Sequence, residues 1–154
     1  MDEEIEERSR KIIEMFNSAK GMDMEDFPAP PFSKWLNPKI LSVERGSMTV
    51  DFKIRPEMAN PTGLFHGGMQ AALMDDLIGA TTATLGYEGF TITIDLHVDF
   101  IGKAKVGEIV KAKTQITREG KRIIHAIAEI TNDNGDVIAT ASSNLLRTTF
   151  KYLG

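Results

Sequence analysis

Near the middle of the chain, a histidine, a glycine pair and an aspartate pair follow one another at spacings that suit acyl-transfer chemistry. His66, Gly67 and Gly68 open a long, mostly apolar stretch that contains Asp75 and Asp76. If this stretch is a helix, its first turn carries unpaired N–H groups and a partial positive charge. Glycines let a ligand atom approach those N–H groups closely, and such donors stabilise the oxyanion formed from a thioester carbonyl. The pattern therefore indicates either an oxyanion site or a helix entry packed against a neighbouring strand.

The two aspartates need an explanation, because the expected helix is apolar on nearly every side, which is typical of a buried helix. A buried charge without a partner is unfavourable. On a helical wheel, Asp75 shares its side with small residues that would admit a partner helix or a ligand: Ala71, Ala72, Gly79 and Thr82. Asp76 lies on a more apolar side, where we expect it to be paired or at an edge. We therefore predict Asp75 as the nucleophile or general base, with a structural, hydrogen-bonded aspartate as the alternative.

One helix cannot bring its own N-terminus and its own Asp75 to the same substrate carbonyl. Asp75 follows Gly67 by eight residues, and this spacing corresponds to roughly 12 Å along the axis at the α-helical rise. Two such helices lying antiparallel would place Asp75 of each near Gly67 of the other. The spacing therefore predicts an obligate homodimer with two shared sites.

The rest of the chain supplies the elements that would enclose this helix, which we expect over residues 68–85. Residues 2–19 have helical periodicity, and residues 22–38 are irregular and proline-rich, with residues 26–32 predicted not to be helical. Six segments are typical of strands: 39–44, 48–54, 90–100, 107–118, 122–132 and 137–150. The later strands are joined by short loops, so we expect them to be antiparallel.

The segment 90–100 shows the most regular alternation in the chain. Thr93 lies on its polar face, and the apolar residues are expected together on the other face: Phe90, Ile92, Ile94, Leu96, Val98 and Phe100. The apolar face of an antiparallel sheet must be covered, and the central helix is the candidate. We therefore predict an α+β fold, a curved antiparallel sheet wrapped around one long central helix, plus an N-terminal helix. We expect one domain, 1–154, with an extension at 1–38 and a core at 39–150.

Composition argues against several classes of protein. The net charge of −4 argues against a nucleic acid partner. The chain has no cysteines, and its three histidines lack metal-ligand spacing, so we expect neither a disulfide nor a metal site. The acidic N-terminus lacks the apolar core of a signal peptide, and the longest apolar run is too short to span a membrane. We expect a cytoplasmic protein that does not contact the membrane.

The chain resembles hotdog-fold acyl-CoA thioesterases in a set of motifs: Asn60, the H-G-G triplet at residues 66–68, Asp75, and the T-I-D-L sequence at residues 93–96. Within these, it is most similar to the phenylacetate-degradation type. The resemblance covers residues 41–147 in the order of elements. It implies hydrolysis of acyl-CoA to a carboxylic acid and free coenzyme A by a homodimer, which we expect to form a homotetramer. Coenzyme A enters as part of the substrate, and no other cofactor is implied.

The resemblance also implies roles for single residues. The Gly67 N–H would polarise the thioester carbonyl, and Gly68 would border the substrate. Asn60 would orient the carbonyl or the attacking water, His66 would position groups across the site or cap the helix, and Thr93 would assist the water. Each of the last three also has an ordinary structural explanation. Asn60 would be a turn residue beside proline, His66 a structural histidine, and Thr93 a common strand residue.

Two other functions stay open. The chain could be a non-catalytic acyl-CoA binding module, because a fold alone does not establish chemistry. It could also be a hotdog-fold enoyl-CoA hydratase or dehydratase. Those enzymes carry a different histidine pattern, with a Pro-Gly before the helix acid, that this chain lacks. The sequence identifies neither the acyl group nor the residues that would bind the phosphates of coenzyme A.

Overall fold

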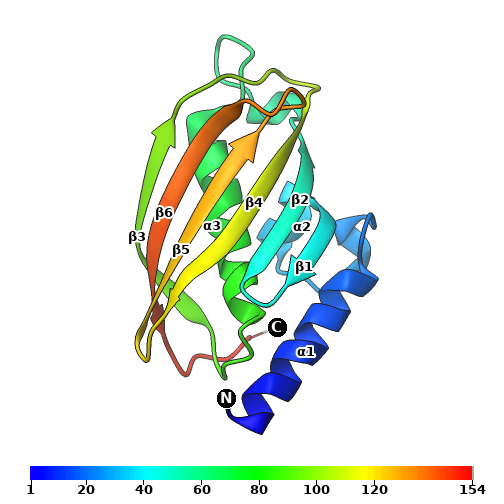
Figure 1. The fold of residues 1–154 in the computed structure, drawn as a ribbon. Helices are drawn as coiled ribbons and strands as arrows, with labels where there is room; N and C mark the ends of the chain where they lie inside the picture. The colour runs from blue at the N-terminus through cyan, green and yellow to red at the C-terminus, as the bar shows by residue number, and fades with distance from the viewer. Residues whose placement is uncertain (154) are drawn as a thin grey trace.

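A six-stranded antiparallel sheet curves around one helix, α3 (Gly67–Ala83), in the computed structural model of residues 1–153 (Figure 1). The strands lie in the order β1-β2-β4-β5-β6-β3. They are β1 (Lys39–Glu44), β2 (Ser47–Lys53), β3 (Thr91–Phe100), β4 (Ile109–Glu119), β5 (Ile123–Thr131) and β6 (Val137–Arg147). This arrangement confirms the predicted α+β class and each predicted strand to within a few residues. Residue 154, the last of the predicted domain, lies outside the described residues.

The core lies between α3 and the concave side of the sheet. Leu73, Met74, Leu77 and Ile78 of α3 are at most 3% exposed. They belong to one cluster with the inward-facing sheet residues, which include Phe52, Val110, Ala112, Ala126, Ile130 and Ala141. Burying each large aliphatic side chain stabilises the fold by about 1.5–3 kcal/mol. This burial explains why a helix with almost no polar side stays inside the curve of the sheet.

The C-terminal end of α3 is tied to the N-terminal helix, α1 (Glu3–Ser18). The Ser9 hydroxyl donates a hydrogen bond of 2.6 Å to the Thr84 carbonyl. Gly86 follows with a φ of +82°, and a side chain at this position would collide with the backbone of Ile5 and Ser9. Glycine is therefore required at residue 86 both for the backbone turn and for the close approach of α1.

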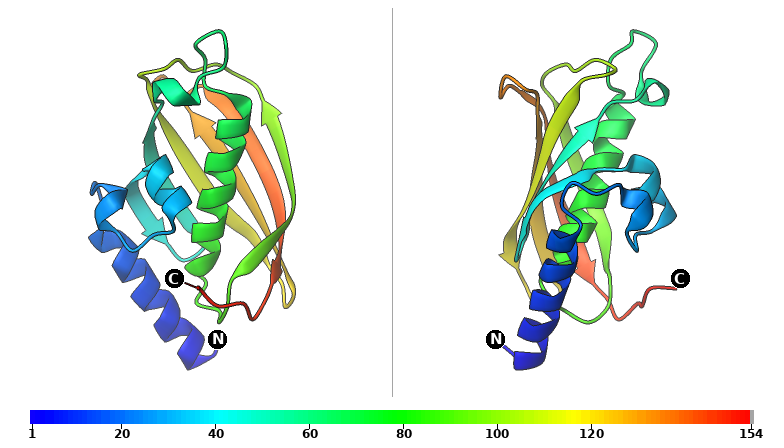
Figure 2. Two further views of the ribbon diagram at one scale, coloured as in Figure 1. Left: turned by 180° about the vertical axis from the view of Figure 1, so that it is seen from behind. Right: turned by 90° about the vertical axis from the view of Figure 1, so that its right-hand side faces the viewer.

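The segment between α1 and β1 contains two short helical turns, η1 (Met24–Asp26) and α2 (Pro31–Leu36). Helix α2 lies beside α3, on the side away from β3 (Figure 2). The prediction that residues 26–32 are not helical was wrong at both ends, because Asp26 is the last residue of η1 and α2 begins at Pro31. Proline is well tolerated at the first helical position, where its missing N–H would have no partner within the helix. A third short turn, η2 (Pro56–Met58), follows β2.

Strand β3 departs from its predicted alternation at a β-bulge. Thr93 pairs with Leu145 of β6 and Asp95 pairs with Asn144, so Ile94 is left without a partner. The extra residue turns the first half of the strand over relative to the second half. As a result, Thr93 faces α3, on the side of buried Leu145.

The prediction that the apolar residues of this strand share one face was therefore wrong for Ile92 and Ile94. They are 44% and 54% exposed, whereas Leu96 and Val98, beyond the bulge, pack against the core. A pattern of period two assumes an uninterrupted pleat, and the bulge breaks it. Within residues 1–153, no helix has the length and hydropathy needed to cross a membrane.

Candidate active site

The N-terminus of α3 is capped by a side chain from the H-G-G triplet. His66 is the N-cap residue, and its Nδ1 accepts a hydrogen bond of 2.9 Å from the Gly68 N–H. The N–H groups of Met69 and Gln70 donate to the His66 carbonyl, each at 3.0 Å. Among the described residues, the Gly67 N–H has no acceptor. One donor at the positive end of the helix is therefore uncommitted.

Both glycines also allow close packing. A Cβ on Gly67 would lie 3.2 Å from the aromatic ring of Phe100, and a Cβ on Gly68 would lie 3.1 Å from the His66 ring. Such contacts are tighter than most Cβ contacts, so a side chain would displace these rings. The alternative of a helix entry packed against a neighbouring strand thus applies to Gly67, which meets Phe100 of β3, alongside its free N–H; Gly68 meets only the N-cap His66.

Asp75 lies on the side of α3 that faces β3. The Thr93 hydroxyl donates a hydrogen bond of 2.9 Å to Asp75 Oδ1. Further along the same side, the hydroxyls of Thr82 and Thr91 are 2.8 Å apart. Asp75 is half-buried and has no ion-pair partner in the part of the chain that the structure describes. Its only hydrogen-bonding partner there is a hydroxyl on the edge strand.

Asp76 points instead toward α2. The Ser33 hydroxyl donates a hydrogen bond of 2.9 Å to Asp76 Oδ1. Burial raises the pKa of Asp76, the hydrogen bond from Ser33 opposes this rise, and the nearby charge of Asp75 adds to it. Asp76 is thus hydrogen-bonded, as expected, but Ser33 was missed because nothing in the sequence links residues this far apart.

Asn60 closes the loop before α3. Its Oδ1 accepts hydrogen bonds from the Thr62 N–H at 2.9 Å, the Thr62 hydroxyl at 2.6 Å and the Leu64 N–H at 3.2 Å. This is the turn geometry that asparagine commonly forms with its own backbone. The carbonyl oxygen of Asn60 is therefore used within the loop, and only its amide nitrogen remains for a ligand.

The structure brings the predicted residues together in two groups. Asn60, His66 and Gly67 lie at the N-terminal end of α3, whereas Asp75 and Thr93 meet farther along the helix. The eight-residue separation of Gly67 and Asp75 on one continuous helix corresponds to roughly 12 Å. A single chain therefore does not offer both groups to one carbonyl. Among residues 1–153, no cluster of three or more His, Cys, Asp or Glu side chains could hold a metal ion.

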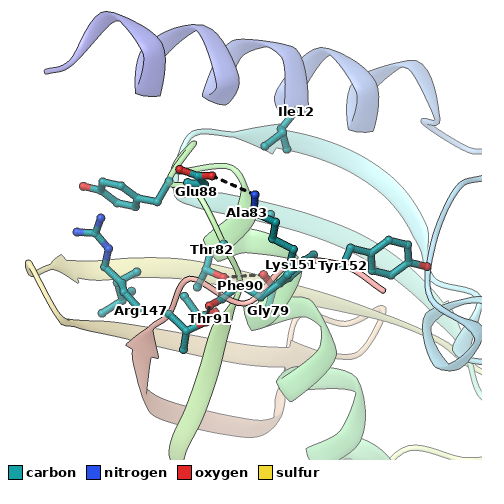
Figure 3. A pocket seen from close by; sticks show the side chains of 14 residues that line it. Ile12, Gly79, Thr82, Ala83, Glu88, Phe90, Thr91, Arg147, Lys151 and Tyr152 are labelled. Atoms are coloured by element: carbon teal, nitrogen blue, oxygen red, sulfur yellow. Dashed lines mark hydrogen bonds and ion pairs between the residues drawn. The ribbon is translucent and has the colours of Figure 1, made fainter. Parts of the chain in front are cut away.

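A cavity of about 350 Å³ is lined by Gly79, Thr82 and Ala83 in the C-terminal half of α3 (Figure 3). Gly79, one helical turn after Asp75, lines it, and a Cβ on Gly79 would meet no atom within 4 Å. The other walls come from α1, the rest of α3, β3, β5 and the C-terminal segment, and include Ile12, Thr82, Ala83, Phe90, Thr91, Ile124 and Tyr152. The cavity is mostly apolar and was not predicted from the sequence.

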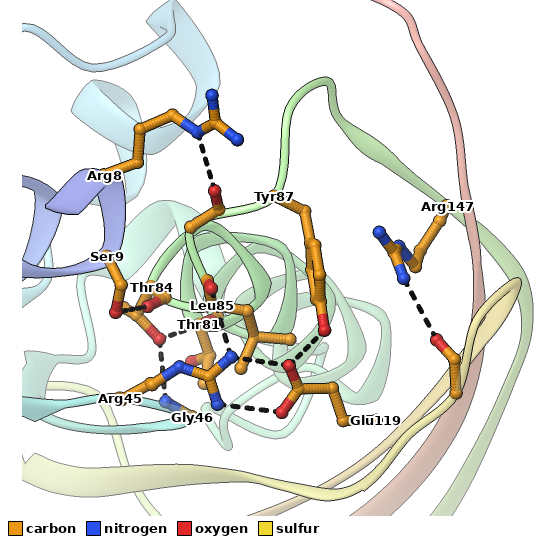
Figure 4. Close-up of polar contacts among 12 residues, drawn as sticks. Arg8, Ser9, Arg45, Gly46, Thr81, Thr84, Leu85, Tyr87, Glu119 and Arg147 are labelled. Atoms are coloured by element: carbon orange, nitrogen blue, oxygen red, sulfur yellow. Dashed lines mark hydrogen bonds and ion pairs between the residues drawn. The ribbon is translucent and has the colours of Figure 1, made fainter. Parts of the chain in front are cut away.

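A polar network fixes the C-terminal end of α3 to the sheet (Figure 4). Arg45 donates to Glu119 at 2.8 Å through Nη1 and to the Leu85 carbonyl at 3.2 Å through Nη2. The Tyr87 hydroxyl also donates to Glu119, and the Arg147 guanidinium lies 3.5 Å from the centre of the Tyr87 ring. The network thus supplies a donor to the Leu85 carbonyl, just beyond the C-terminal end of α3.

A family model for the thioesterase superfamily matches residues 62–139. The chain belongs to the thioesterase superfamily. The matched range includes the H-G-G triplet, Asp75 and Thr93. The human acyl-coenzyme A thioesterase 13 is 27% identical over 103 residues, covering 65% of this chain and 72% of the relative. The mouse protein of the same name is 26% identical over 117 residues, covering 73% and 82%.

Solved structures of proteins linked to phenylacetic acid degradation share the same fold. A phenylacetic acid degradation-related protein from Ralstonia eutropha is 27% identical, with a TM-score of 0.70, over 78% of this chain and 92% of that one. The Escherichia coli PaaI protein is 20% identical, with a TM-score of 0.76, over 92% and 96%. These matches confirm the hotdog fold, the resemblance to the phenylacetate-degradation type and the predicted enzyme class, a thioesterase.

Proposed function

We propose that this thioesterase hydrolyses acyl-CoA to a carboxylic acid and free coenzyme A, with each active site shared between two copies of the chain. The observation that carries the proposal is the environment of Asp75, a half-buried carboxylate held by one hydroxyl and by no cation of the described chain. A carboxylate in this state can attack a carbonyl or accept a proton. The name of the human relative, acyl-coenzyme A thioesterase 13, supports the substrate class.

In the proposed reaction, the thioester carbonyl lies at the N-terminus of α3. The Gly67 N–H donates to its oxygen and stabilises the oxyanion. The partner subunit's Asp75 either attacks the carbonyl carbon, giving an anhydride that water then hydrolyses, or removes a proton from the attacking water. In both routes the carbon–sulfur bond breaks and coenzyme A leaves as the thiolate. Because Thr93 bonds Oδ1 of Asp75, Oδ2 is the oxygen available for either step.

The hydrogen bonds at the N-terminus of α3 determine which atoms of the other residues remain free to contact the substrate. The Gly68 N–H is committed to His66, so Gly68 contributes space for the substrate and Gly67 contributes the donor. His66 keeps Nε2 for the substrate, since Nδ1 is occupied. Asn60 would act through its amide nitrogen, donating to the carbonyl or to the attacking water.

The edge strand β3 supports self-association. It lies at the end of the sheet, so one side of its backbone has no neighbouring strand, and it carries exposed Ile92, Ile94 and Phe100. Long apolar edges of this kind pair readily with another chain. Pairing with β3 of a second copy would give the proposed homodimer and would bring two α3 helices together. We extend the proposal to a homotetramer, for which the exposed Ile109, Ile123 and Ile127 offer apolar surface.

Hydrolysis of an acyl-CoA panel by wild type and by Asp75→Asn tests the catalytic assignment. The released thiol can be followed directly, because the chain has no cysteine of its own. Loss of turnover in Asp75→Asn with retained acyl-CoA binding would support the proposal, and equal rates would overturn it. Binding without turnover by wild type would indicate a non-catalytic module. Turnover of enoyl-CoA to a hydrated product would indicate a hydratase.

Gly67→Pro tests the oxyanion donor separately. Proline lacks the N–H and suits the first helical position, which Gly67 occupies. The preceding residue, His66, already has the extended backbone that proline requires (φ −61°, ψ 133°). We expect turnover to fall about 100-fold or more. Gly67→Ala is the matched control, because it adds a Cβ near Phe100 but keeps the N–H.

A further inference from the structure

The first half of β3 has an orientation that its own sequence does not favour. In an uninterrupted strand, Ile92 and Ile94 would face α3 with Leu96 and Val98, and Thr93 would face outward. The bulge at Ile94 reverses this: the isoleucines are exposed and Thr93 bonds Asp75. Exposing two isoleucines is unfavourable in a single chain, so interactions within the sheet, or with the proposed partner strand, must hold the bulge.

The carboxylate of Asp95 supplies one set of these interactions. Its Oδ1 accepts a hydrogen bond of 2.9 Å from the Asn144 N–H, and its Oδ2 accepts one of 3.0 Å from the Asn144 side-chain amide. From the inner side, the Ser143 hydroxyl donates to the Asp95 carbonyl at 2.8 Å. The pKa of Asp95 is lowered by the hydrogen bonds from Asn144. The Asp95 carboxylate thus accepts a hydrogen bond from a backbone N–H of β6, next to Ile94, which the bulge leaves unpaired.

His125 of β5 extends the contact between Asp95 and Asn144 across the sheet. Because the Asn144 amide nitrogen donates to Asp95, its Oδ1 is the acceptor for His125 Nδ1 of β5, at 3.0 Å. On the same outer face, Ile92 lies opposite Leu146, and Leu146 lies opposite Ile123. Apolar cross-strand pairs of this kind add modest stability to the outward placement of Ile92.

We propose that Asp95 is a positioning residue of the thioesterase site: by holding the bulge at Ile94, it turns Thr93 toward Asp75. The expected effect of Asp95 on catalysis rests on the proposed function. Its effect on the orientation of Thr93 does not. Asp95 itself lies on the outer face of the sheet, paired with Asn144, and acts only through the orientation of Thr93. Removing it should release the bulge and let the strand return to regular alternation, with Thr93 facing away from α3.

A double-mutant cycle between Asp95 and Thr93 tests the proposal. Because the Thr93 hydroxyl donates to a charged group, we expect Thr93→Val to lower kcat by about tenfold or more. Asp95→Ala should lower kcat by a similar factor with little change in KM. If Asp95 acts through Thr93, the double variant should be no slower than the slower single variant. A double variant slowed by the product of the two factors, or an unaffected Asp95→Ala, would overturn the proposal.

Deleting Ile94 provides a rescue that a merely structural role would not show. Without this residue, Thr93 and Leu96 both face α3 in an ordinary strand, so the bulge and its support are no longer needed. We expect the deletion to restore most of the kcat lost in Asp95→Ala, and no restoration would count against the proposal. If Asp95→Ala does not fold, Asp95→Asn keeps one acceptor for the Asn144 N–H and enters the same cycle.

Crystal structures of wild type and Asp95→Ala separate this inference from the proposed function. We expect the Thr93–Asp75 hydrogen bond in wild type and its loss in the variant, whether or not the protein hydrolyses acyl-CoA. Persistence of that bond in Asp95→Ala would overturn the inference and leave the thioesterase proposal intact. A wild type without acyl-CoA hydrolysis would overturn only the proposed function.

Discussion

The Ser33 hydroxyl donates a hydrogen bond of 2.9 Å to the Asp76 carboxylate and so joins α2 to the central helix. Burial raises the pKa of Asp76 in the folded protein. Its proton is therefore bound more tightly in the folded state than in the unfolded state. Between the ordinary and the raised pKa, the folded protein binds more protons, so stability falls as the pH rises through this window.

We expect Asp76→Asn to raise the melting temperature at neutral pH, because the asparagine oxygen still accepts from Ser33 but carries no charge. The gain should shrink as the pH falls below the ordinary pKa of aspartate, where wild type is protonated in both states. Thermal unfolding across this pH range measures the effect, with Asp133→Asn in an exposed turn as the control. Equal melting temperatures at neutral pH would contradict the prediction.

Glu119 should show the opposite dependence. Hydrogen bonding to Arg45 lowers the pKa of Glu119, opposed by partial burial. A carboxyl with a lowered pKa stabilises the fold above its unfolded pKa, and this stabilisation is lost as the pH falls through the folded pKa. We expect Glu119→Gln to lower the melting temperature at neutral pH and to differ little from wild type at strongly acid pH. If the melting temperature of Glu119→Gln stayed below that of wild type by the same amount at acid pH, Glu119 would stabilise the fold by packing and not by charge.

Gly79 should control the size of the acyl group. Its position one turn after Asp75, facing a cavity of about 350 Å³, places any added side chain in open space. We expect Gly79→Leu to lower kcat/KM for long or aromatic acyl-CoA by about tenfold or more and to leave acetyl-CoA nearly unchanged, since each buried CH₂ is worth about 0.8 kcal/mol.

Gly79→Ala is the matched control for this prediction. It should stabilise the helix by about 0.5–1 kcal/mol with a smaller effect on the acyl preference. The measurement is a series of acyl-CoA substrates of increasing length with all three proteins. An unchanged length profile in Gly79→Leu would show that the acyl group does not enter this cavity.

A lysine at Ile94 should prevent pairing of the edge strands. Natural sheets use charged edge residues to stop association with other chains, and Ile94 is 54% exposed on the edge strand. We expect Ile94→Lys to be monomeric by light scattering at micromolar concentration and to lose turnover, because one chain lacks a complete site. Ile109→Lys, with an isoleucine that is 47% exposed on β4, should keep the dimer. A monomeric Ile94→Lys with full activity would contradict the shared site.

The elements were predictable because their signals are local. The apolar stretch after the H-G-G triplet predicted α3, and alternation between turns predicted the strands. The separation of Gly67 and Asp75 follows from the rise of an α-helix alone. The side of α3 on which Asp75 lies was also predictable, because it follows from helical periodicity over a few residues.

The features that escaped prediction depend on contacts between distant parts of the chain. Asp95 meets Asn144 across 49 residues, and Ser33 meets Asp76 across 43. The bulge at Ile94 therefore could not be distinguished from a regular strand, whose alternation the sequence displays. Thr93 was predicted on the outward polar face with Asp95, which was wrong, because the bulge turns Thr93 toward α3.

The separation of Gly67 and Asp75 along α3 has a genetic consequence. In a mixed dimer of Gly67→Pro and Asp75→Asn chains, one site combines an intact Gly67 with an intact Asp75, and the other site carries both defects. Two inactive proteins, unfolded together and refolded, should then complement each other, restoring roughly a quarter of the wild-type sites if subunits of a two-fold dimer assort at random. Mutations at the start and in the middle of this helix would behave as alleles that rescue one another, although both lie in one short segment of one gene.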